Sequence, residues 1–231
     1  MAGGIEAGGG GGVEAQMRWA FIRKVYAIVS LQLLVCTAVS AAMFFTPAVK
    51  TFMATTSGLI VLIAVFIVTF IILIAMKIWE QTHPWNYVLL GLFTIALAFM
   101  VGVVCTYKKG MPIMLAAGVT ALVFVVLTLY TFWATKRGYD FSFLGPILIS
   151  ALMVLILFSL IKLFLHLGSI IQLICGAIGA LIFSGFIIYD TYNLIQKYSY
   201  DEYVDAACCL FLDIINLFLA ILEILGVSDW N

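Results

Sequence analysis

Long apolar segments follow one another along almost the whole chain, and no other feature constrains the fold as strongly. Seven of them can be drawn, at about 26–46, 57–77, 86–106, 112–133, 142–164, 170–190 and 204–226. Each matches the ~20 apolar residues that a helix needs to cross the hydrocarbon core of a bilayer. Inside that core the backbone must satisfy its own hydrogen bonds, which a helix does within each segment. We therefore predict an all-α polytopic membrane protein with seven transmembrane helices.

The composition excludes the obvious alternative, a soluble helical bundle. Hydrophobic residues make up 65% of the chain and charged residues only 10%, whereas soluble domains are about 25% charged. Only short polar loops separate the apolar segments, so the lipid bilayer is the first expected partner. The formal net charge is +0, which gives no basic surface for nucleic acid.

The two ends of the chain differ in character. Residues 1–17 are rich in glycine and short of apolar residues, a composition typical of disorder, and we expect a disordered cytosolic tail. Residues 18–231 form the seven-helix membrane domain. Because no signal-peptide pattern precedes the first span, that span is expected to act as its own insertion signal.

Basic residues near the ends of the spans predict the orientation. With a cytosolic N-terminus, the cytosolic side holds Arg18, Arg23, Lys24, Lys77, Lys136, Arg137 and Lys197, and the opposite side holds Lys50, Lys108, Lys109 and Lys162. This excess predicts a cytosolic N-terminus and, after seven spans, a C-terminus across the membrane. A re-entrant last segment would instead return the C-terminus to the cytosol.

Two acidic residues, Asp190 and Asp213, lie inside the last two apolar segments. The polar turn between these segments is centred near Glu202, 12 residues after Asp190 and 11 before Asp213. Two antiparallel helices joined there would hold both carboxyl groups at one depth, roughly 15 Å from the turn. A charged residue at such a depth costs about 2.5–3.5 kcal/mol to insert, and intramembrane acids usually face the protein interior and carry function.

Two further polar residues of the last segment follow Asp213. Asn216 and Glu223 could extend a polar stripe that lines a pathway. Alternatively, Asn216 forms a hydrogen bond to another helix and Glu223 lies at the membrane edge. The five cysteines have no metal-ligand spacing, so we expect no resident cofactor and no certain metal site.

Several stretches resemble the Bax inhibitor-1 / transmembrane BAX inhibitor motif family, and within it the Lifeguard branch in its plant form. They are Arg18-Trp-Ala-Phe-Ile-Arg-Lys-Val-Tyr26, His83-Pro-Trp-Asn-Tyr-Val-Leu-Leu-Gly-Leu-Phe-Thr94, Leu127-Thr-Leu-Tyr-Thr-Phe-Trp133, Lys136-Arg-Gly-Tyr-Asp-Phe-Ser-Phe-Leu-Gly-Pro146, Gly185-Phe-Ile-Ile-Tyr-Asp-Thr191 and Leu212-Asp-Ile-Ile-Asn-Leu-Phe218. Together they run over almost the whole membrane domain.

The resemblance implies a central last helix wrapped by the other six. It also implies a proton-sensitive calcium leak through intracellular membranes and suppression of stress-induced cell death. The family's aspartyl pair corresponds to Asp190 and Asp213, although Phe211 here replaces the usual tyrosine two residues before the second acid. A basic latch near the end of the second span, seen in some relatives, would correspond to Lys77.

The chemistry of two adjacent buried carboxyl groups suggests a gate. Both cannot be charged cheaply at low dielectric, so they would share one proton and titrate as a pair. Loss of that proton would favour water entry and separation of the last two helices. An opened acidic cavity suits a hard cation. The resemblance implies that this cation is Ca²⁺, with a possible binding site at Asp190 and Asp213, and that H⁺ is the regulator.

Two other classes compete with a pH-sensitive calcium leak. An intramembrane aspartyl protease also pairs acids on adjacent helices, but the Gly-x-Gly-Asp pattern of such enzymes is missing before Asp213, so we expect no enzyme. The second is a non-conducting regulator of cell death that binds other membrane proteins of cell-death or stress pathways. The resemblance favours an endomembrane (endoplasmic reticulum, Golgi or vacuole) or the plasma membrane, without choosing among them.

The orientation gives the first testable prediction. A glycosylation acceptor added at the N-terminus should stay unmodified in microsomes, because the excess of basic residues keeps that end cytosolic. The same acceptor at the C-terminus should be glycosylated after an odd number of spans. Modification of the N-terminal acceptor would contradict the orientation, and two unmodified termini would indicate a re-entrant last segment.

Overall fold

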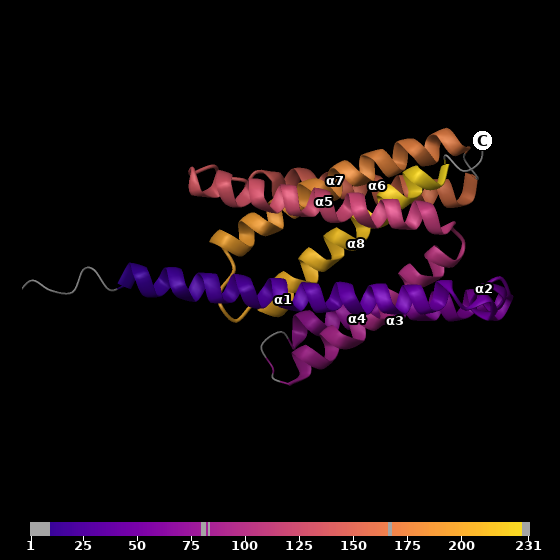
Figure 1. The fold of residues 1–231 in the computed structure, drawn as a ribbon, viewed down its shortest axis with the longest axis horizontal. Coiled ribbons are helices and arrows are strands. Elements are labelled where there is room, and N and C mark those ends of the chain that lie inside the picture. The colour runs from indigo at the N-terminus through magenta and orange to yellow at the C-terminus, as the bar shows by residue number, and fades with distance from the viewer. Residues whose placement is uncertain (1–9, 80–81, 83, 166–167, 228–231) are drawn as a thin grey trace, which may run out of the picture.

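The chain folds into an elongated bundle of helices in the computed structural model, which describes residues 10–79, 82, 84–165 and 168–227 (Figure 1). Eight helices are found in this part of the chain: α1 Gly10–Phe44, α2 Pro47–Met53, α3 Thr56–Ile78, α4 Trp85–Thr106, α5 Gly110–Lys136, α6 Leu144–Leu165, α7 Ser169–Gln196 and α8 Tyr203–Val227. Seven of these described helices are long and apolar enough to cross a membrane, and α2 is a short connecting helix. The predicted fold class is confirmed.

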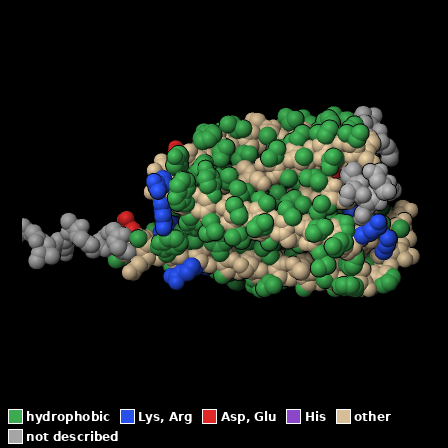
Figure 2. Space-filling model, turned by 45° about the horizontal axis from the view of Figure 1, so that its top comes forward, with side chains coloured by type: hydrophobic (Ala, Val, Ile, Leu, Met, Phe, Trp, Pro, Cys, Tyr) green, Lys and Arg blue, Asp and Glu red, His purple; other side chains and the backbone are tan. Residues whose placement is uncertain are grey.

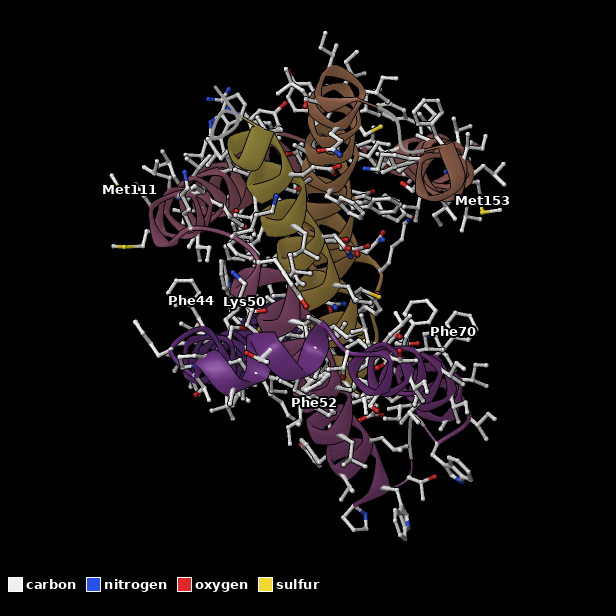
Figure 3. The ribbon with its side chains drawn as sticks, turned by 90° about the vertical axis from the view of Figure 1, so that its right-hand side faces the viewer. Phe44, Lys50, Phe52, Phe70, Met111 and Met153 are labelled. Atoms are coloured by element: carbon white, nitrogen blue, oxygen red, sulfur yellow. The ribbon has the colours of Figure 1, made fainter. Side chains whose placement is uncertain are left out.

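The last helix, α8, lies at the centre of the bundle. It packs directly against α1, α4, α5 and α7, its longest contact being with α7, and it is the most buried of the seven spans. The other two spans lie farther out, where α3 packs on α4 and α6 packs on α7. The yellow ribbon of α8 accordingly runs between the other helices in both Figure 1 and Figure 3.

The observed helices extend several of the predicted spans. Residues 10–17, expected to be part of a disordered tail, form the first turns of α1, and residues 1–9 of that tail lie outside the described residues. Val13–Met17 continue a helix that already exists, and extending a formed helix avoids the costly nucleation step. Glu14, Ala15, Gln16 and Met17 also have good helix propensity. Helix α7, which corresponds to the sixth predicted span, likewise continues past the predicted end at residue 190 to Gln196.

The surface has the pattern of a membrane protein. On the face drawn in Figure 2, hydrophobic side chains cover the middle of the molecule, and the visible Lys and Arg side chains lie at its two ends. Phe70 of α3, for example, points outward in Figure 3 with 61% of its surface exposed. In a bilayer such side chains contact lipid, so their exposure costs nothing there.

Small residues let α7 approach α8 closely. A side-chain carbon at Gly176 would lie 2.8 Å from Ile224 and 3.0 Å from the Ala220 carbonyl oxygen of α8, and one at Gly179 would lie 3.4 Å from the Ala220 side chain. Close backbone approach through small residues is a general means of helix association in membranes. The tight α7–α8 contact brings the acidic segments of both helices together.

The polar motif between α5 and α6 forms a turn. Gly138 has a φ of 85°, in the left-handed region that glycine occupies without strain. The backbone amide of Ser142 donates to Asp140 Oδ1 at 2.8 Å. Hydrogen bonds from the Ser142 side chain and backbone lower the pKa of Asp140 to about 2. This part of the Lys136–Pro146 motif therefore has a structural explanation.

The centre of the bundle gives a stability prediction. Phe211 of α8 and Phe93 of α4 are both fully buried and meet edge to face, with ring centroids 6.4 Å apart. Phe211→Ala should lower the unfolding free energy by about 3–5 kcal/mol because the cavity cannot fully collapse. The measurement is unfolding of the purified protein in detergent. Phe70→Ala, at a lipid-facing position, is the matched control and should change stability little; equal losses would contradict the central position of Phe211.

Candidate functional site: a buried acidic pair

The structure brings Asp190 of α7 and Asp213 of α8 together. Their carboxyl groups lie within hydrogen-bonding reach of each other across the α7–α8 contact. Asp213 is buried, with 6% of its surface exposed, and Asp190 is partly buried. The sequence predicted this juxtaposition from the distance of each acid to the intervening turn.

The two acids differ in their further partners. The Asp190 carboxyl also lies within hydrogen-bonding reach of Asn193, one helical turn along α7. Among the described residues, no hydrogen-bond partner meets the Oδ2 atom of Asp213. A buried polar atom without a partner costs free energy, so the Oδ2 atom of Asp213 needs an explanation.

Asn193 was not selected from the sequence, although a signal was present. Residues three apart on a helix lie on one face, so an amide at i+3 from an intramembrane acid is a natural partner. Asn193 is also buried, and its own Oδ1 atom has no hydrogen-bond partner within the described residues. The polar site therefore extends from the acid pair toward the α7–α8 turn.

Lys77 pairs with a different acid from the one the family latch would contact. Its Nζ atom lies 2.8 Å from Oδ2 of Asp205, two helical turns before Asp213 on α8. The Lys77 side chain is 64% exposed and that of Asp205 21% exposed. The ion pair thus connects the outer helix α3 to the central helix α8 near the α7–α8 turn.

The two further polar residues of α8 each have a partner within the protein. Asn216 donates from Nδ2 to the Leu212 carbonyl of its own helix at 2.9 Å, not to a group on another helix. Glu223 forms an ion pair with Lys162 of α6. Both residues therefore have structural partners in the described part of the chain, and a role for Asn216 and Glu223 in a pathway stays a prediction.

Basic residues of α1 hold the α7–α8 turn. Arg18 donates from Nη1 to the Tyr198 carbonyl at 2.5 Å, and its guanidinium lies 4.9 Å from the centre of the Tyr200 ring. The Lys24 amine lies 3.1 Å from the centre of the Tyr203 ring, a cation–π geometry. The first helix thus fixes the turn that aligns the two acidic helices.

A small polar cavity of about 280 Å³ opens at the same turn. Its lining residues are Tyr189, Asn193, Lys197, Tyr198 and Glu202. Asn193 belongs both to this cavity and to the surroundings of Asp190. Through Asn193, the cavity at the turn adjoins the acid pair.

The site offers few groups for a resident metal. Within the described part of the chain, no three His, Cys, Asp or Glu side chains cluster closely enough to hold one. The oxygens of Asp190, Asp213 and Asn193 are the available donors, and hard cations such as Ca²⁺ prefer six to eight oxygen ligands. These three side chains alone do not supply that number of ligands.

Together these features define a class: a seven-span, all-helical membrane protein with an acidic pair between its last two helices. Residues 18–230 match the family described as inhibitor of apoptosis-promoting Bax1, and the chain belongs to this family. The resemblance seen in the sequence is therefore confirmed. The family is described by its effect on cell death and not by a catalysed reaction.

Relatives from a plant, an animal and a virus cover nearly the same length. Protein LIFEGUARD 4 of Arabidopsis thaliana is 51% identical over 93% of this chain and 87% of its own length. Protein lifeguard 4 of Mus musculus is 40% identical over 92% of this chain and 87% of its own. The Golgi anti-apoptotic protein of Vaccinia virus (strain Lister) is 40% identical over 94% of this chain and 89% of its own.

The Lys77–Asp205 pair gives a prediction by charge exchange. Asp205→Lys should destabilise the protein, because it places two cations together near the turn. Adding Lys77→Asp should restore the attraction and recover about 0.2–1 kcal/mol, the usual range for an ion pair near the surface. Unfolding of the two single variants and the double variant in detergent measures this coupling. Additive effects would show that the Lys77–Asp205 contact between α3 and α8 does not stabilise the protein.

Proposed function

We propose that this protein suppresses stress-induced cell death as a pH-sensitive calcium leak channel of an intracellular membrane. Asp190 and Asp213 are its proton sensor and gate. Ca²⁺ is the transported ion, H⁺ the regulator, and no resident cofactor is involved. The family membership supports the role in cell death, and the buried acid pair supports the proton-gated leak.

One observation carries the proposal more than any other. Asp213 is buried at the centre of a membrane bundle, next to a second carboxyl group and with one oxygen atom unpartnered. Two carboxylates so close at low dielectric cannot both ionise at low cost, so they share a proton. A pair that served only packing would be less costly as two neutral amides or apolar residues.

The shared proton acts as a clasp between α7 and α8. While it is present, a hydrogen bond links the two helices at a point where both are closely packed. When the pH rises and the proton leaves, two like charges face each other in a poorly solvated site. Water entry and separation of α7 from α8 then lower the free energy, so the leak increases as the pH rises.

Other ionisable groups surround the pair and set its response. Asp205 interacts electrostatically with Asp190, and Cys208 interacts with Asp213. Tyr198, from the turn, lies within the field of Asp190 and Asp205, and burial raises the pKa of its hydroxyl. Cys209 also interacts electrostatically with both acids of the pair. Lys77 offsets the charge of Asp205.

The polar cavity at the α7–α8 turn is the proposed entrance from the cytosolic side. Its Glu202 and Tyr198 groups, followed by Asn193, supply oxygen atoms along a path toward Asp190. Oxygen ligands can replace part of the hydration shell of Ca²⁺ in steps. Separation of α7 from α8 would extend this path past Asp213.

The alternative is a non-conducting regulator that acts by binding other membrane proteins. The family name refers to inhibition of apoptosis and the name of the viral relative to an anti-apoptotic protein, and neither name refers to ion flux. We propose an endomembrane location with a cytosolic N-terminus; the name of the viral relative, a Golgi protein, is compatible with it.

Calcium flux from proteoliposomes across a pH series tests the proposal. The wild-type protein should release Ca²⁺ faster as the pH is raised through the titration of the pair. Asp213→Asn should abolish this dependence, since a neutral amide cannot lose the proton. Asp201→Asn, in the exposed turn, removes an acid of the same type and should keep the pH response.

The outcomes separate the candidate functions. A pH response unchanged in Asp213→Asn would remove the pair from its role as sensor. Absence of flux at every pH, from protein that is folded and correctly inserted, would favour the non-conducting regulator. Loss of the response in both variants would indicate that the variants alter the fold and not the gate.

A further inference from the structure

A second cavity lies on the lipid-facing side of the bundle and shares no lining residue with the polar cavity at the α7–α8 turn. It measures about 650 Å³ and lies between the second half of α1 and the first half of α5, with α4 and α8 behind it. Aromatic contacts join the first half of α1 to the second half of α5, where Trp19 meets Phe132 and Tyr26 meets Phe124. Phe124 also lines the cavity, so the Tyr26–Phe124 contact closes its inner end.

The walls of the cavity present hydrocarbon. Small residues, Ala41 on α1 and Ala117 and Ala121 on α5, form its sides, and Ile214, Ile215 and Phe218 of α8 line its back. Its volume falls in the range of ~300–1,000 Å³ typical of ligand sites. A bound molecule would therefore contact side chains from four helices, α1, α4, α5 and α8.

The few polar groups in the lining are already hydrogen-bonded within the protein. Thr37 donates to the Leu33 carbonyl at 2.8 Å, Ser40 to the Ala98 carbonyl at 3.4 Å and Thr120 to the Ala116 carbonyl at 2.7 Å. Since these hydroxyl hydrogens are engaged, the walls favour an apolar occupant over water, an ion or a polar ligand. The cavity is accordingly distinct from the proposed cation path.

The opening of the cavity faces the bilayer. Met114 and Phe45 line it and are 73% and 78% exposed on the membrane surface of the helices. The lining runs from Leu33 to Phe45 along α1, roughly 18 Å at 1.5 Å per residue. That length is close to the ~15 Å of acyl chains in one leaflet, half of the hydrocarbon core.

A basic residue lies near the outer end of the cavity. Lys50, on α2, is exposed and follows Phe44 and Phe45 by one short connection. Figure 3, which looks onto this end, shows Lys50 beside Phe44 on the side of the bundle where Met111 of α5 also lies. A lysine at the edge of a hydrocarbon cavity complements the phosphate of a lipid headgroup.

We infer that this cavity is a binding site for a membrane phospholipid, with one acyl chain between α1 and α5 and the phosphate near Lys50. The inference is independent of the proposed cation flux. Its occupant contacts Ile214, the residue after Asp213, and so lies against the same central helix as the acid pair.

Photolabelling tests the site in the full-length protein reconstituted in nanodiscs. The probe is phosphatidylcholine with a diazirine near the end of one acyl chain, and labelled peptides are mapped by mass spectrometry. We expect labelling of residues 33–45 and 110–125 to exceed that of the lipid-exposed helix α3. Ala117→Trp with Ala121→Trp should remove this excess by filling the cavity.

Matched variants separate occupancy of the cavity from general effects. Ala64→Trp, at an exposed position on α3, should leave the pattern unchanged. Ala41→Phe fills the cavity from the α1 side and should remove the excess even if the double α5 variant fails to fold. Lys50→Gln should lower the labelling roughly two- to fivefold, the value of one exposed charge contact.

Three outcomes would overturn the inference. Labelling no stronger than on α3 would show that only ordinary boundary lipid covers this face. Preferential labelling by a photoreactive sterol in place of phosphatidylcholine would assign another occupant. Disulfide-linked dimers of Met114→Cys in nanodiscs would show that a second copy covers the opening.

Discussion

The contact between two carboxyl groups at the α7–α8 interface is the constraint on which the rest of the structure depends. Burial of Asp213 requires a partner that can share or donate a proton, and Asp190 meets this need only if both helices keep their register. Small residues, Gly176 and Gly179, allow the required close approach. Arg18 and Lys24 then hold the turn that sets this register.

Electrostatic contacts at both ends of α8 connect the outer helices to this centre. Asp205, near the turn, pairs with Lys77 of α3, and Glu223, near the other end, pairs with Lys162 of α6. These are the two spans that pack mainly on α4 and α7 and not on α8. The charges on the central helix thus have different roles according to depth: those near its ends tie the bundle together, and the deepest one forms the proposed gate.

The two cavities differ in size and in the polarity of their walls. The one at the α7–α8 turn is small and polar, and it shares Asn193 with the surroundings of Asp190. The one between α1 and α5 is larger and apolar, and opens toward lipid. Both involve residues adjoining the α7–α8 acid pair, so a cation path and a lipid site can bear on the same helix without sharing a surface.

The sequence determined the features that follow from hydrophobicity and spacing along the chain. Apolar length fixed the seven spans, because a bilayer accepts only segments that satisfy their own backbone. Equal distances from one turn predicted that Asp190 and Asp213 meet. The tertiary structure decided which charges pair between helices: Lys77 with Asp205 in place of the deeper acids, Glu223 with Lys162, and Asn216 with its own helix. It also decided where α1 and α5 lie far enough apart to leave the apolar cavity between them. Such contacts depend on the rotation and crossing of whole helices, which the periodicity of a uniformly apolar segment leaves undetermined.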